Sequence, residues 1–516
     1  MGASQLVSSN KWPLALIAAW VFLGLFGHDP WKPDEAYTFG LVFHILQTGD
    51  WVVPMLADEP FMEKPPLFFL TAAIFAKLFG WALPLHDAAR LASAFYVVTA
   101  LYFVAKTARS LHAPLLLIAC LGYVHHAHLL ITDNALVAGI AMGIYGFSIS
   151  NSRSAWGGLL TGTGAGIAFL SKGLLGPGLL ALIALALLAF PDWRNPRFLK
   201  SWLWGLLAFA PWALVWPWLL WRESPALFSE WLWVQNLGRF TGEHKIGGVP
   251  DHWHYVKALP WFAFPAWPLA AWAMYSGRKE IFSKAELQLP LVAFLVMFAV
   301  LSASSLARQI YALPMLLPVC ILAARAAGVP RWLGVPLDRL AIWGAAVAGL
   351  ALWALWISFF SGWPARIAAE APGFLPRVDP LWLGLGTSTT LLWFFLVRRE
   401  GLAVRFAAGS MLAWGLVMTI WLPYLDYAKS YRGVIADMQH HRPAGTACIT
   451  APNLTEPQRA VFHYFAGITK SAETKDCPLL LLTTSSDKPP AAEGRRLLWR
   501  GTRPGDDKER FWLFSR

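Results

Sequence analysis

The chain has 516 residues, of which 57% are hydrophobic and only 14% are charged, and it contains 30 tryptophans. A soluble protein carries about 25% charged residues, so the composition excludes an ordinary soluble enzyme and indicates a membrane protein. The formal net charge is +12, but the basic residues lie in short turns between apolar segments. That placement is typical of a topology signal and argues against nucleic acid as a partner.

Long apolar runs recur along most of the chain, for example at residues 174–190 and 340–360. Each is close to the roughly 20 residues that cross a bilayer as a helix, whereas an outer-membrane barrel shows short alternating segments. We therefore predict an all-α polytopic membrane protein with about 13 transmembrane helices. Their predicted starts lie near residues 12, 87, 112, 133, 155, 174, 200, 257, 287, 309, 339, 380 and 404.

The connections between these segments alternate in charge. One set is rich in basic residues: Lys106, Arg109, Arg153, Arg194, Arg197, Lys200, Arg278, Lys279, Lys284, Arg325, Arg331, Arg339, Arg398, Arg399 and Arg405. The positive-inside rule places this set, and with it the N-terminus, in the cytoplasm of a bacterial inner membrane. An odd number of spans then places the C-terminus outside. The opposite connections hold scattered charges of both signs, which are costly near a membrane and usually functional.

The first long loop, residues 28–86, is expected on the outer side and is too long for a plain connector. Residues 34–50 have an acidic start, helical apolar spacing and Gly49 near the end, which is typical of a helix. Residues 65–80 are apolar but short for a span. We expect both to be helices lying in the outer interface. The other interpretation, a short tilted span, would invert the downstream topology and spoil the charge pattern.

The C-terminal segment, residues 424–516, is charged, contains Pro and Gly turns and has no apolar run long enough to span. Its sequence predicts short strands and one helix, and so a small extracytoplasmic α/β domain that follows a transmembrane domain of residues 1–423. An oxidising compartment makes a Cys448–Cys477 disulfide plausible. Two free thiols are the alternative.

A Glu–Lys pair, Glu63 and Lys64, lies directly before two prolines and an apolar run. Pro65 suits the first turn of a helix and disfavours helical geometry at Lys64. The pair therefore precedes a helix N-terminus, where the free amides and the dipole favour an anion such as phosphate. Glu63 beside a phosphate would require a bridging divalent metal ion. The alternative is a surface ion pair that anchors an interfacial helix.

Seven stretches together resemble the GT-C glycosyltransferases of the protein-mannosyltransferase and lipid A aminoarabinose-transferase superfamily. In chain order they are "PDEAY" (33–37), "LQTGDWVVP" (46–54), "EKPPLFF" (63–69), "ITDNALVA" (131–138), "FLSKGLLGPGL" (169–179), "NLGRFTGEHK" (236–245) and "SSLARQIYALPMLLP" (304–318). The resemblance implies a GT-C-like fold. It also implies transfer of one sugar from a polyprenyl-phosphate donor to a lipid, glycan or protein acceptor outside the membrane, with inversion at the anomeric carbon.

The resemblance assigns roles to individual residues. Asp34 is implied as the catalytic carboxylate, which deprotonates a hydroxyl or positions an ionised acceptor. Glu35 is implied as a second acid that takes part in catalysis or orients the site, and Asp133 as a further acidic position. A helix N-cap is the alternative for Asp34 and for Asp133.

Basic and metal-ligating candidates complete the set. The residues expected to hold phosphate are Lys64, Lys172, Arg239 and Arg308. Glu63 and His244 are the candidate ligands of the divalent metal ion, with His252 and His254 as competing histidines. The alternative to phosphate binding, for any one of these basic residues, is a side chain that snorkels from the membrane interface into water.

Two stretches depart from the family pattern. "KIGGVPDHWHYV" after His244 is longer than expected, and "RQIY" after Ala307 lacks a lysine close to the tyrosine. These departures leave the roles of His244 and Arg308 open and are compatible with a different donor or acceptor. A transporter or flippase for a lipid-linked anion is the alternative function, but such proteins usually carry inverted repeats, and we detect none in the sequence.

Overall fold

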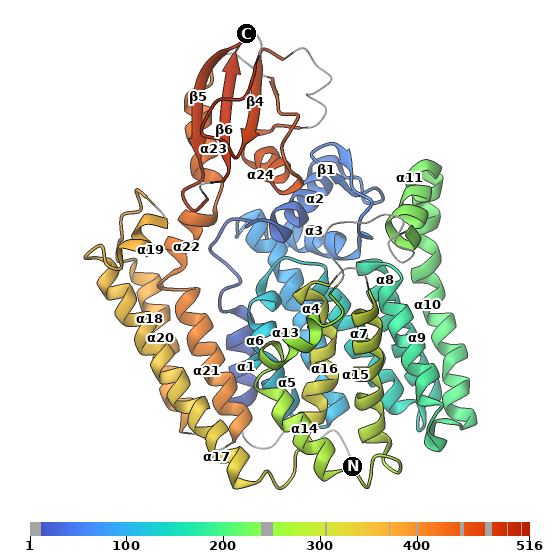
Figure 1. The fold of residues 1–516 in the computed structure, drawn as a ribbon. Coiled ribbons are helices and arrows are strands. Elements are labelled where there is room, and N and C mark those ends of the chain that lie inside the picture. The colour runs from blue at the N-terminus through green and yellow to red at the C-terminus, as the bar shows by residue number, and fades with distance from the viewer. Residues whose placement is uncertain are drawn as a thin grey trace.

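A computed structural model describes residues 12–238, 251–304, 307–370, 372–398, 401–443, 448–469, 477–492, 494–506 and 508–515. The fold is mostly helical, with a small sheet at one end of the helical part (Figure 1). The first helices are α1 (Trp12–Phe22), α2 (Asp34–Thr48), α3 (Leu67–Phe79), α4 (Leu85–Ala108), α5 (His112–Ala119), α6 (Leu121–Val124), η2 (His126–His128), α7 (Asp133–Ser150), α8 (Ser154–Lys172), α9 (Leu175–Leu187), η3 (Pro191–Trp193), α10 (Pro196–Glu223), α11 (Pro225–Ser229) and η4 (Glu230–Gly238).

The remaining elements complete the bundle and form the sheet. The helices are α13 (His254–Phe262), α14 (Ala266–Ser276), α15 (Ala285–Ala303), η5 (Gln309–Ala312), α16 (Leu313–Ala323), α17 (Arg331–Arg339), η6 (Leu340–Gly344), α18 (Ala345–Phe359), α19 (Ala365–Glu370), α20 (Pro380–Val397), α21 (Leu402–Val417), α22 (Leu422–Lys429), α23 (Arg432–His440) and α24 (Glu456–Ala466). The strands are β1 (Met55–Leu56), β2 (Glu59–Pro60), β3 (Ile449–Thr450), β4 (Leu479–Thr484), β5 (Arg496–Thr502) and β6 (Arg510–Ser515).

Helices occupy the predicted spans, and the predicted fold class is confirmed. Within the described residues, five helices are long and apolar enough to cross a membrane, or up to seven if each of two bent pairs is one span. The other predicted spans coincide with shorter apolar helices such as α1 and α9, or with interrupted ones such as α13 and α14.

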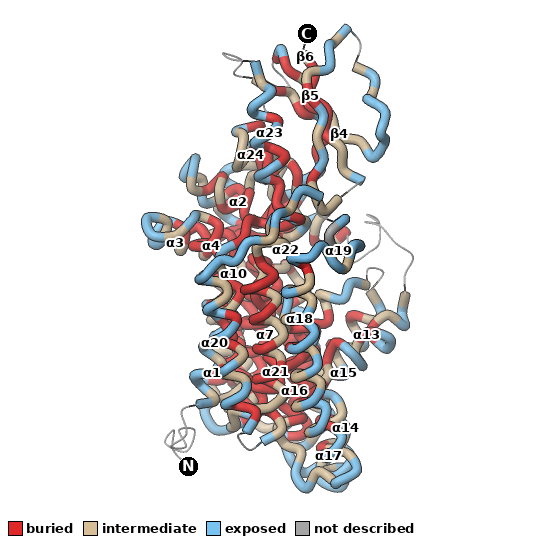
Figure 2. The backbone as a smooth tube through the Cα atoms, turned by 90° about the vertical axis from the view of Figure 1, so that its left-hand side faces the viewer, coloured by how far each residue is buried: buried red, intermediate tan, exposed pale blue. Residues whose placement is uncertain are grey.

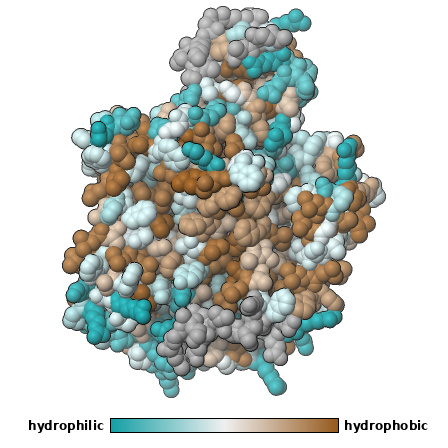
Figure 3. All heavy atoms as spheres, turned by 180° about the vertical axis from the view of Figure 1, so that it is seen from behind, coloured by the Kyte–Doolittle hydropathy of each residue, from teal (hydrophilic) through white to brown (hydrophobic). Residues whose placement is uncertain are grey.

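The outward faces of the peripheral helices are apolar. Helix α10 exposes Leu203, Leu206 and Leu214, and α18 exposes Val347 and Leu350, each by more than half of its surface. Figure 2 shows buried residues in the interior of the bundle and exposed ones along its outer helices. In the space-filling view, hydrophobic residues spread over the middle of the helical part and hydrophilic ones gather towards its two ends (Figure 3). Exposed leucine and valine over several turns are typical of a lipid-facing surface.

Small residues bring α7, α8 and α10 into close contact. A methyl group on Gly162 would lie 2.1 Å from the carbonyl oxygen of Gly205, and one on Gly139 would lie 2.4 Å from that of Gly164. Glycine lets membrane helices approach until their backbones touch. Because α7 and α8 are antiparallel neighbours, this packing brings the first residue of α7, Asp133, beside the last residue of α8, Lys172.

The first long loop contains the two expected helices, α2 and α3, which begin and end close to the predicted positions. Helix α2 ends at Gly49, which has a left-handed φ of 72° and whose N–H donates to the carbonyl of Ile45. The left-handed conformation favours glycine at a helix end. The short hairpin β1–β2 follows.

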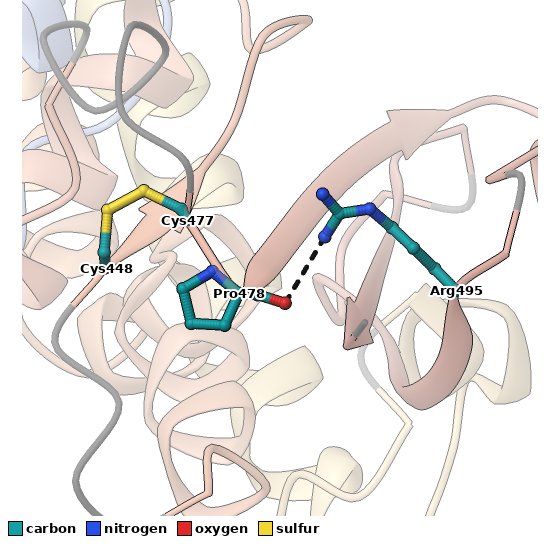
Figure 4. The surroundings of a disulfide bond; sticks show 4 residues. All are labelled: Cys448, Cys477, Pro478 and Arg495. Carbon is teal, nitrogen blue, oxygen red and sulfur yellow. Dashed lines mark hydrogen bonds between the residues drawn. A yellow bond between two sulfur atoms is a disulfide. The ribbon is translucent and has the colours of Figure 1, made fainter.

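The C-terminal segment forms the predicted strands and helix. Its four-stranded sheet has the order β3-β4-β6-β5, in which β3 and β4 are parallel and the other pairs are antiparallel. A disulfide joins Cys448, just before β3, to Cys477, just before β4 (Figure 4). The bond therefore ties the starts of two neighbouring parallel strands.

Helix α24 attaches this sheet to the first long loop. Tyr464 packs edge-on against Phe39, with the ring centroids 4.7 Å apart, and His463 contacts Phe43. Gly40 lies so close to Ala460 that a methyl group on it would come within 2.7 Å of the alanine Cβ. The loop is thus held between the helical bundle and the C-terminal segment.

Candidate active site

A pocket of about 210 Å³, the small pocket, lies where α2, α7, α8 and the first long loop meet. Seven of the nine predicted site residues line it: Asp34, Glu35, Glu63, Lys64, Asp133, Lys172 and Arg308. The other two, Arg239 and His244, lie outside the described residues. Residues from five separate stretches of sequence are therefore brought to one place.

Asp34 is linked to Lys64 through a tyrosine. The Tyr37 hydroxyl donates a hydrogen bond to the Asp34 carboxylate, and the Lys64 ammonium donates to the oxygen of the same hydroxyl. Burial, followed by the charge of Asp34, raises the pKa of Tyr37 above its ordinary value, so the phenol stays protonated and remains a donor. Asp34 is the first residue of α2, whose N-cap position is held by Pro33. The predicted N-cap alternative for Asp34 is therefore not what the fold uses.

Lys64 is only 8% exposed and lies three residues before α3. Burial, and then the positive charge of Lys172, lower the pKa of Lys64, whereas Glu63 and Asp34 act in the opposite direction. A bound anion would favour the charged ammonium and offset this effect. The environment of Lys64 is thus suited to a negatively charged ligand.

Asp133 and Lys172 form an ion pair with an N–O distance of 2.9 Å. The Lys172 ammonium also lies 5.3 Å from the ring centre of Tyr311. Thr132, not Asp133, occupies the N-cap position of α7. Asp133 therefore orients Lys172 at the pocket wall, and the tyrosine ring adds a favourable cation–π contact.

Glu35 points away from Asp34 into a fully buried ion pair. Its carboxylate accepts hydrogen bonds from Arg90 Nε at 3.0 Å, the Leu130 amide at 3.0 Å and the Trp31 amide at 3.4 Å. Glu35 and Arg90 are each 1% exposed. Burial alone would raise the pKa of Glu35, but the Arg90 guanidinium and the hydrogen bonds outweigh it and hold the pKa at about 2.

Arg90 also binds the segment that leads into α2. It donates to Asp87 Oδ1 at 2.6 Å, to the His28 carbonyl at 2.8 Å and to the Asp29 carbonyl at 3.0 Å. The Asp29 carboxylate in turn binds Arg432 at 2.5 Å and the Ser430 hydroxyl at 2.6 Å. One chain of charged groups therefore runs from α4 through the start of the first long loop to the C-terminal segment.

A second cavity of about 550 Å³, the large cavity, adjoins the small pocket. Six residues line both: Pro33, Asp34, Tyr37, Glu63, Arg308 and Tyr311. The far wall of the large cavity comes from α24, with Glu456, Pro457 and Arg459, and Arg459 forms an ion pair with Glu59 of the hairpin. Asp34 thus lies between a smaller and a larger space.

Several pocket residues were not predicted from the sequence. Tyr37 lies one helical turn after Asp34, so helical spacing could have found it. Arg90 is a charged residue inside a predicted span, which is itself a signal of function or pairing. Tyr311, His125, His126 and Lys429 also line the small pocket, and they carry no comparable local signal.

The predicted metal site at Glu63 and His244 remains a prediction. Glu63 lines both cavities, but its predicted partner His244 is outside the described residues. In the part of the chain that the structure describes, no group of three His, Cys, Asp or Glu side chains is arranged to hold a metal ion. The described side chains alone do not form a metal site, so a metal ion would also require His244, and we derive no chemical step through one.

Three kinds of similarity to known proteins bear on this site. Residues 63–221 match the family model described as dolichyl-phosphate-mannose-protein mannosyltransferase. The chain is 30% identical over 320 residues to an undecaprenyl phosphate-alpha-4-amino-4-deoxy-L-arabinose arabinosyl transferase of Sodalis glossinidius, a match that covers 57% of this chain and 54% of the relative. A protein of the same description from Pseudomonas fluorescens is 28% identical over 377 residues, covering 67% of this chain and 63% of the relative. The matched regions thus span little more than half to under two thirds of these relatives.

The fold has a match over nearly the full length. The crystal structure of ArnT from Cupriavidus metallidurans bound to undecaprenyl phosphate superposes with a TM-score of 0.70 at 18% identity, covering 98% of both chains. The apo structure of the same protein superposes with a TM-score of 0.68 at 17% identity. Fold and apolar helices together define an integral membrane protein with a GT-C fold. The predicted resemblance to the protein-mannosyltransferase and lipid A aminoarabinose-transferase superfamily is confirmed, and the comparisons give no support to the transporter alternative.

The Glu35–Arg90 pair is expected to dominate the stability of the site. Replacing Arg90 with Met leaves a buried carboxylate without its partner, which costs about 3–5 kcal/mol, and should lower the thermal unfolding temperature of the detergent-solubilised protein strongly. The double variant Glu35→Gln/Arg90→Met should lose less free energy of unfolding than the two single variants added together. Each single variant leaves one buried charge without its partner, whereas the double variant removes both charges.

Arg109 provides the matched control, because it pairs with Glu286 while 75% of its side chain is exposed. Arg109→Met should change stability by less than about 1 kcal/mol. Equal unfolding temperatures for the two arginine variants would contradict a stabilising role for the buried pair.

Proposed function

We propose that the chain is a glycosyltransferase that moves a single sugar from a polyprenyl-phosphate donor to an envelope acceptor: a lipid A-like glycolipid, a glycan or a protein. One observation carries the proposal: Asp34 shares a small pocket with Lys64, Lys172 and Arg308. A carboxylate beside clustered cations suits an acceptor that attacks a sugar whose leaving group is a phosphate. The names of the curated relatives and the undecaprenyl phosphate bound in the similar crystal structure support the same reading.

The basic residues hold the carrier phosphate. Lys64 and Lys172 both line the small pocket and influence each other electrostatically, and Arg308 is exposed and lines both cavities. A phosphate between them relieves their mutual repulsion. Arg239 is proposed to join this group. Cations placed in advance stabilise the negative charge that develops on the phosphate oxygen as the sugar–oxygen bond breaks.

Asp34 acts on the acceptor. The acceptor oxygen attacks the anomeric carbon of the sugar, the bond from that carbon to the phosphate oxygen breaks, and polyprenyl phosphate leaves with the bonding electrons. For a hydroxyl acceptor the proton passes to Asp34; for an ionised phosphate acceptor Asp34 positions the nucleophile and takes no proton. Attack from the side opposite to the phosphate inverts the anomeric centre.

The other two acids support these groups. Glu35 engages both of its carboxylate oxygens in hydrogen bonds to Arg90 and to two amides. It therefore fixes the start of α2 and with it the position of Asp34. Asp133 holds Lys172 through their ion pair. Both residues contribute to catalysis by placing a group that contacts the substrate.

The two spaces around Asp34 suit two substrates. The small pocket contains the cations and is of a size for the sugar phosphate, whereas the large cavity extends under α24 of the C-terminal segment. We assign the donor headgroup to the small pocket and the acceptor to the large cavity. Residues 424–516 would then form a domain of their own that contributes to acceptor binding, following a transmembrane domain of residues 1–423.

We further propose the orientation given by the positive-inside rule. The basic connections, including Arg278 and Lys279, face the cytoplasm together with the N-terminus, and the first long loop and residues 424–516 face the outside. The pocket then opens towards the outer leaflet. Membrane lipids surround the apolar faces of α10 and α18.

Loss of Asp34 or Lys64 is expected to abolish transfer. In cells that lack the native gene, wild-type protein should add the mass of one sugar to an envelope lipid or glycan, as measured by mass spectrometry. Asp34→Asn should reduce the rate by about 10²–10⁴-fold and Lys64→Ala by about 10²–10³-fold. Lys77→Ala, which changes an exposed lysine of α3, is the control and should retain activity. Transfer that persists in both pocket variants would refute the site assignment.

The orientation predicts where reporter fusions are active. Alkaline phosphatase, which folds only outside the cytoplasm, should be active when fused after Arg516 and inactive when fused after Lys279. A green fluorescent protein should show the reverse pattern at the two positions. Activity of the phosphatase at Lys279 would place the pocket on the cytoplasmic side and exclude the proposed reaction there.

The metal assignment of Glu63 and His244 predicts a response to chelation. Thorough treatment of the purified protein with a chelator should lower transfer at least tenfold, and adding back a divalent ion should restore it. Glu63→Gln and His244→Ala should each weaken that restoration. Unchanged turnover after metal removal would reject a catalytic metal ion and leave Glu63 with an orienting role.

A further inference from the structure

One end of the small pocket is not used by the mechanism above. It is formed by Trp31, His125, His126 and Lys429, and is called here the Lys429 end. These four residues line the same space as Asp34 and the phosphate-binding lysines. A donor bound by its phosphate at Lys64 and Lys172 therefore shares the small pocket with them.

The Lys429 end is built from two broken helices. His125 and His126 belong to the segment Leu121–His128, which is bent by 118° from α7, and Lys429 ends α22, which is bent by 59° from α21. Irregular backbone within a membrane protein persists where it lines a cavity. The carbonyl of Leu129, freed by the first break, accepts hydrogen bonds from Ser93 Oγ at 2.7 Å and Asn134 Nδ2 at 3.0 Å. Both bends bring nitrogen-bearing side chains to the same pocket.

The charge of Lys429 is not neutralised by a neighbouring acid. Among the described residues Lys429 forms no ion pair, and its ammonium lies 4.5 Å from the ring centre of Trp31. Glu35 is the carboxylate that acts on it most strongly, but both oxygens of Glu35 are engaged by Arg90 and by two amides. A ligand with a negative group would complete this site.

The two histidines offer polar contacts beside this charge. His126 Nδ1 lies 2.8 Å from the carbonyl oxygen of Gly122. Because a carbonyl oxygen only accepts, this nitrogen carries the proton and Nε2 is left for the pocket. The imidazole of His125 makes no hydrogen bond to another described residue and interacts electrostatically with Lys429. Sugar hydroxyls both donate and accept, so they suit these nitrogens.

We propose that the Lys429 end binds a carboxylate on the donor sugar, so that the transferred sugar is of the uronic-acid type rather than an amino sugar. This inference rests on the proposed function. Lys429 would pair with the carboxylate, Trp31 would pack against the ring, and the histidines would bind hydroxyls. A sugar ammonium in the same position would meet Lys429 as a like charge. The relatives are named for 4-amino-4-deoxy-L-arabinose, so the difference is one of specificity.

An acceptor phosphate is the other source of a negative group. The large cavity, which adjoins the small pocket at Asp34, offers the acceptor more than twice the volume, about 550 Å³ against about 210 Å³. The Lys429 end belongs to the small pocket and not to the large cavity. We therefore assign the negative group to the donor.

Displacement binding tests the inference directly. Full-length protein in nanodiscs is loaded with radiolabelled undecaprenyl phosphate, which is displaced by farnesyl phosphates that carry glucuronic acid, glucose or 4-amino-4-deoxyarabinose. The glucuronosyl compound should displace the label at a concentration about tenfold below that of the glucosyl compound, and the amino compound should be weakest. Equal displacement by the first two compounds, or a preference for the amino compound, would overturn the inference.

Variants of Lys429 test whether this residue causes the preference for the glucuronosyl compound. Lys429→Gln should bring the glucuronosyl and glucosyl compounds to within twofold of each other, Lys429→Arg should retain the preference, and Lys429→Glu should favour the amino compound. Lys284→Gln is the control, because Lys284 is exposed and pairs with Glu280 at 2.7 Å. A preference that survives in Lys429→Gln would overturn the assignment to this residue.

Two further outcomes separate this inference from the proposed function. Failure of the wild-type protein to bind undecaprenyl phosphate, or binding that is unaffected by Lys64→Ala, would refute the phosphate site itself. The other outcome is a Lys429→Gln variant that leaves the order of donors unchanged but alters the competition between phosphorylated and dephosphorylated lipid A. That result would assign the negative group to the acceptor and overturn the inference while leaving the proposed function intact.

Discussion

The buried pair of Glu35 and Arg90 is the interaction on which the site depends. Both side chains are almost fully inaccessible, so the pair persists only because each charge is balanced and hydrogen-bonded. Arg90 belongs to α4 and Glu35 to α2, and Arg90 also binds the carbonyls of His28 and Asp29. The segment between α1 and α2 is thereby fixed to the bundle. Asp34, the residue next to Glu35, takes its position from this anchor.

The two adjacent acids differ in role: Glu35 is engaged in the buried ion pair with Arg90, whereas Asp34 is available to a ligand. Both carboxylate oxygens of Glu35 accept hydrogen bonds, and its low pKa keeps it ionised. Glu35 is therefore better suited to a structural role than to proton transfer. Asp34 has only the Tyr37 hydroxyl among its described hydrogen-bond donors and lies between two cavities. Adjacent acids in one motif therefore have different environments, and that difference makes Asp34 the better candidate for chemistry.

Much of the fold followed from the sequence because hydropathy and local turn chemistry act over short distances. The apolar runs located the spans, and the acidic start and Gly49 located α2. The Glu63–Lys64 pair indicated an anion site because the prolines beside it define a helix start. Seven predicted site residues converge on the small pocket, since the motifs that carried the resemblance lie at helix ends on one side of the bundle.

Arg90 and Lys429 were not predicted, because their importance depends on partners far away in the sequence. The bends before α7 and before α22 were also missed, since apolar composition does not specify where a helix breaks.

The longest-range contacts of the loop have a consequence for biosynthesis. Asp29 and Arg432 are separated by 403 positions, and Lys32 reaches Asp506 and Glu509, which lie further still. A ribosome that adds about 5–20 residues per second needs on the order of 20–80 s to make the partner after the first residue has emerged. The nascent protein therefore carries these charges unmatched while the bundle assembles. A product that terminates early would lack the contacts that Asp29 and Lys32 make with the C-terminal segment, so the start of the first long loop reaches its full set of ion pairs only after residues 432, 506 and 509 have been made.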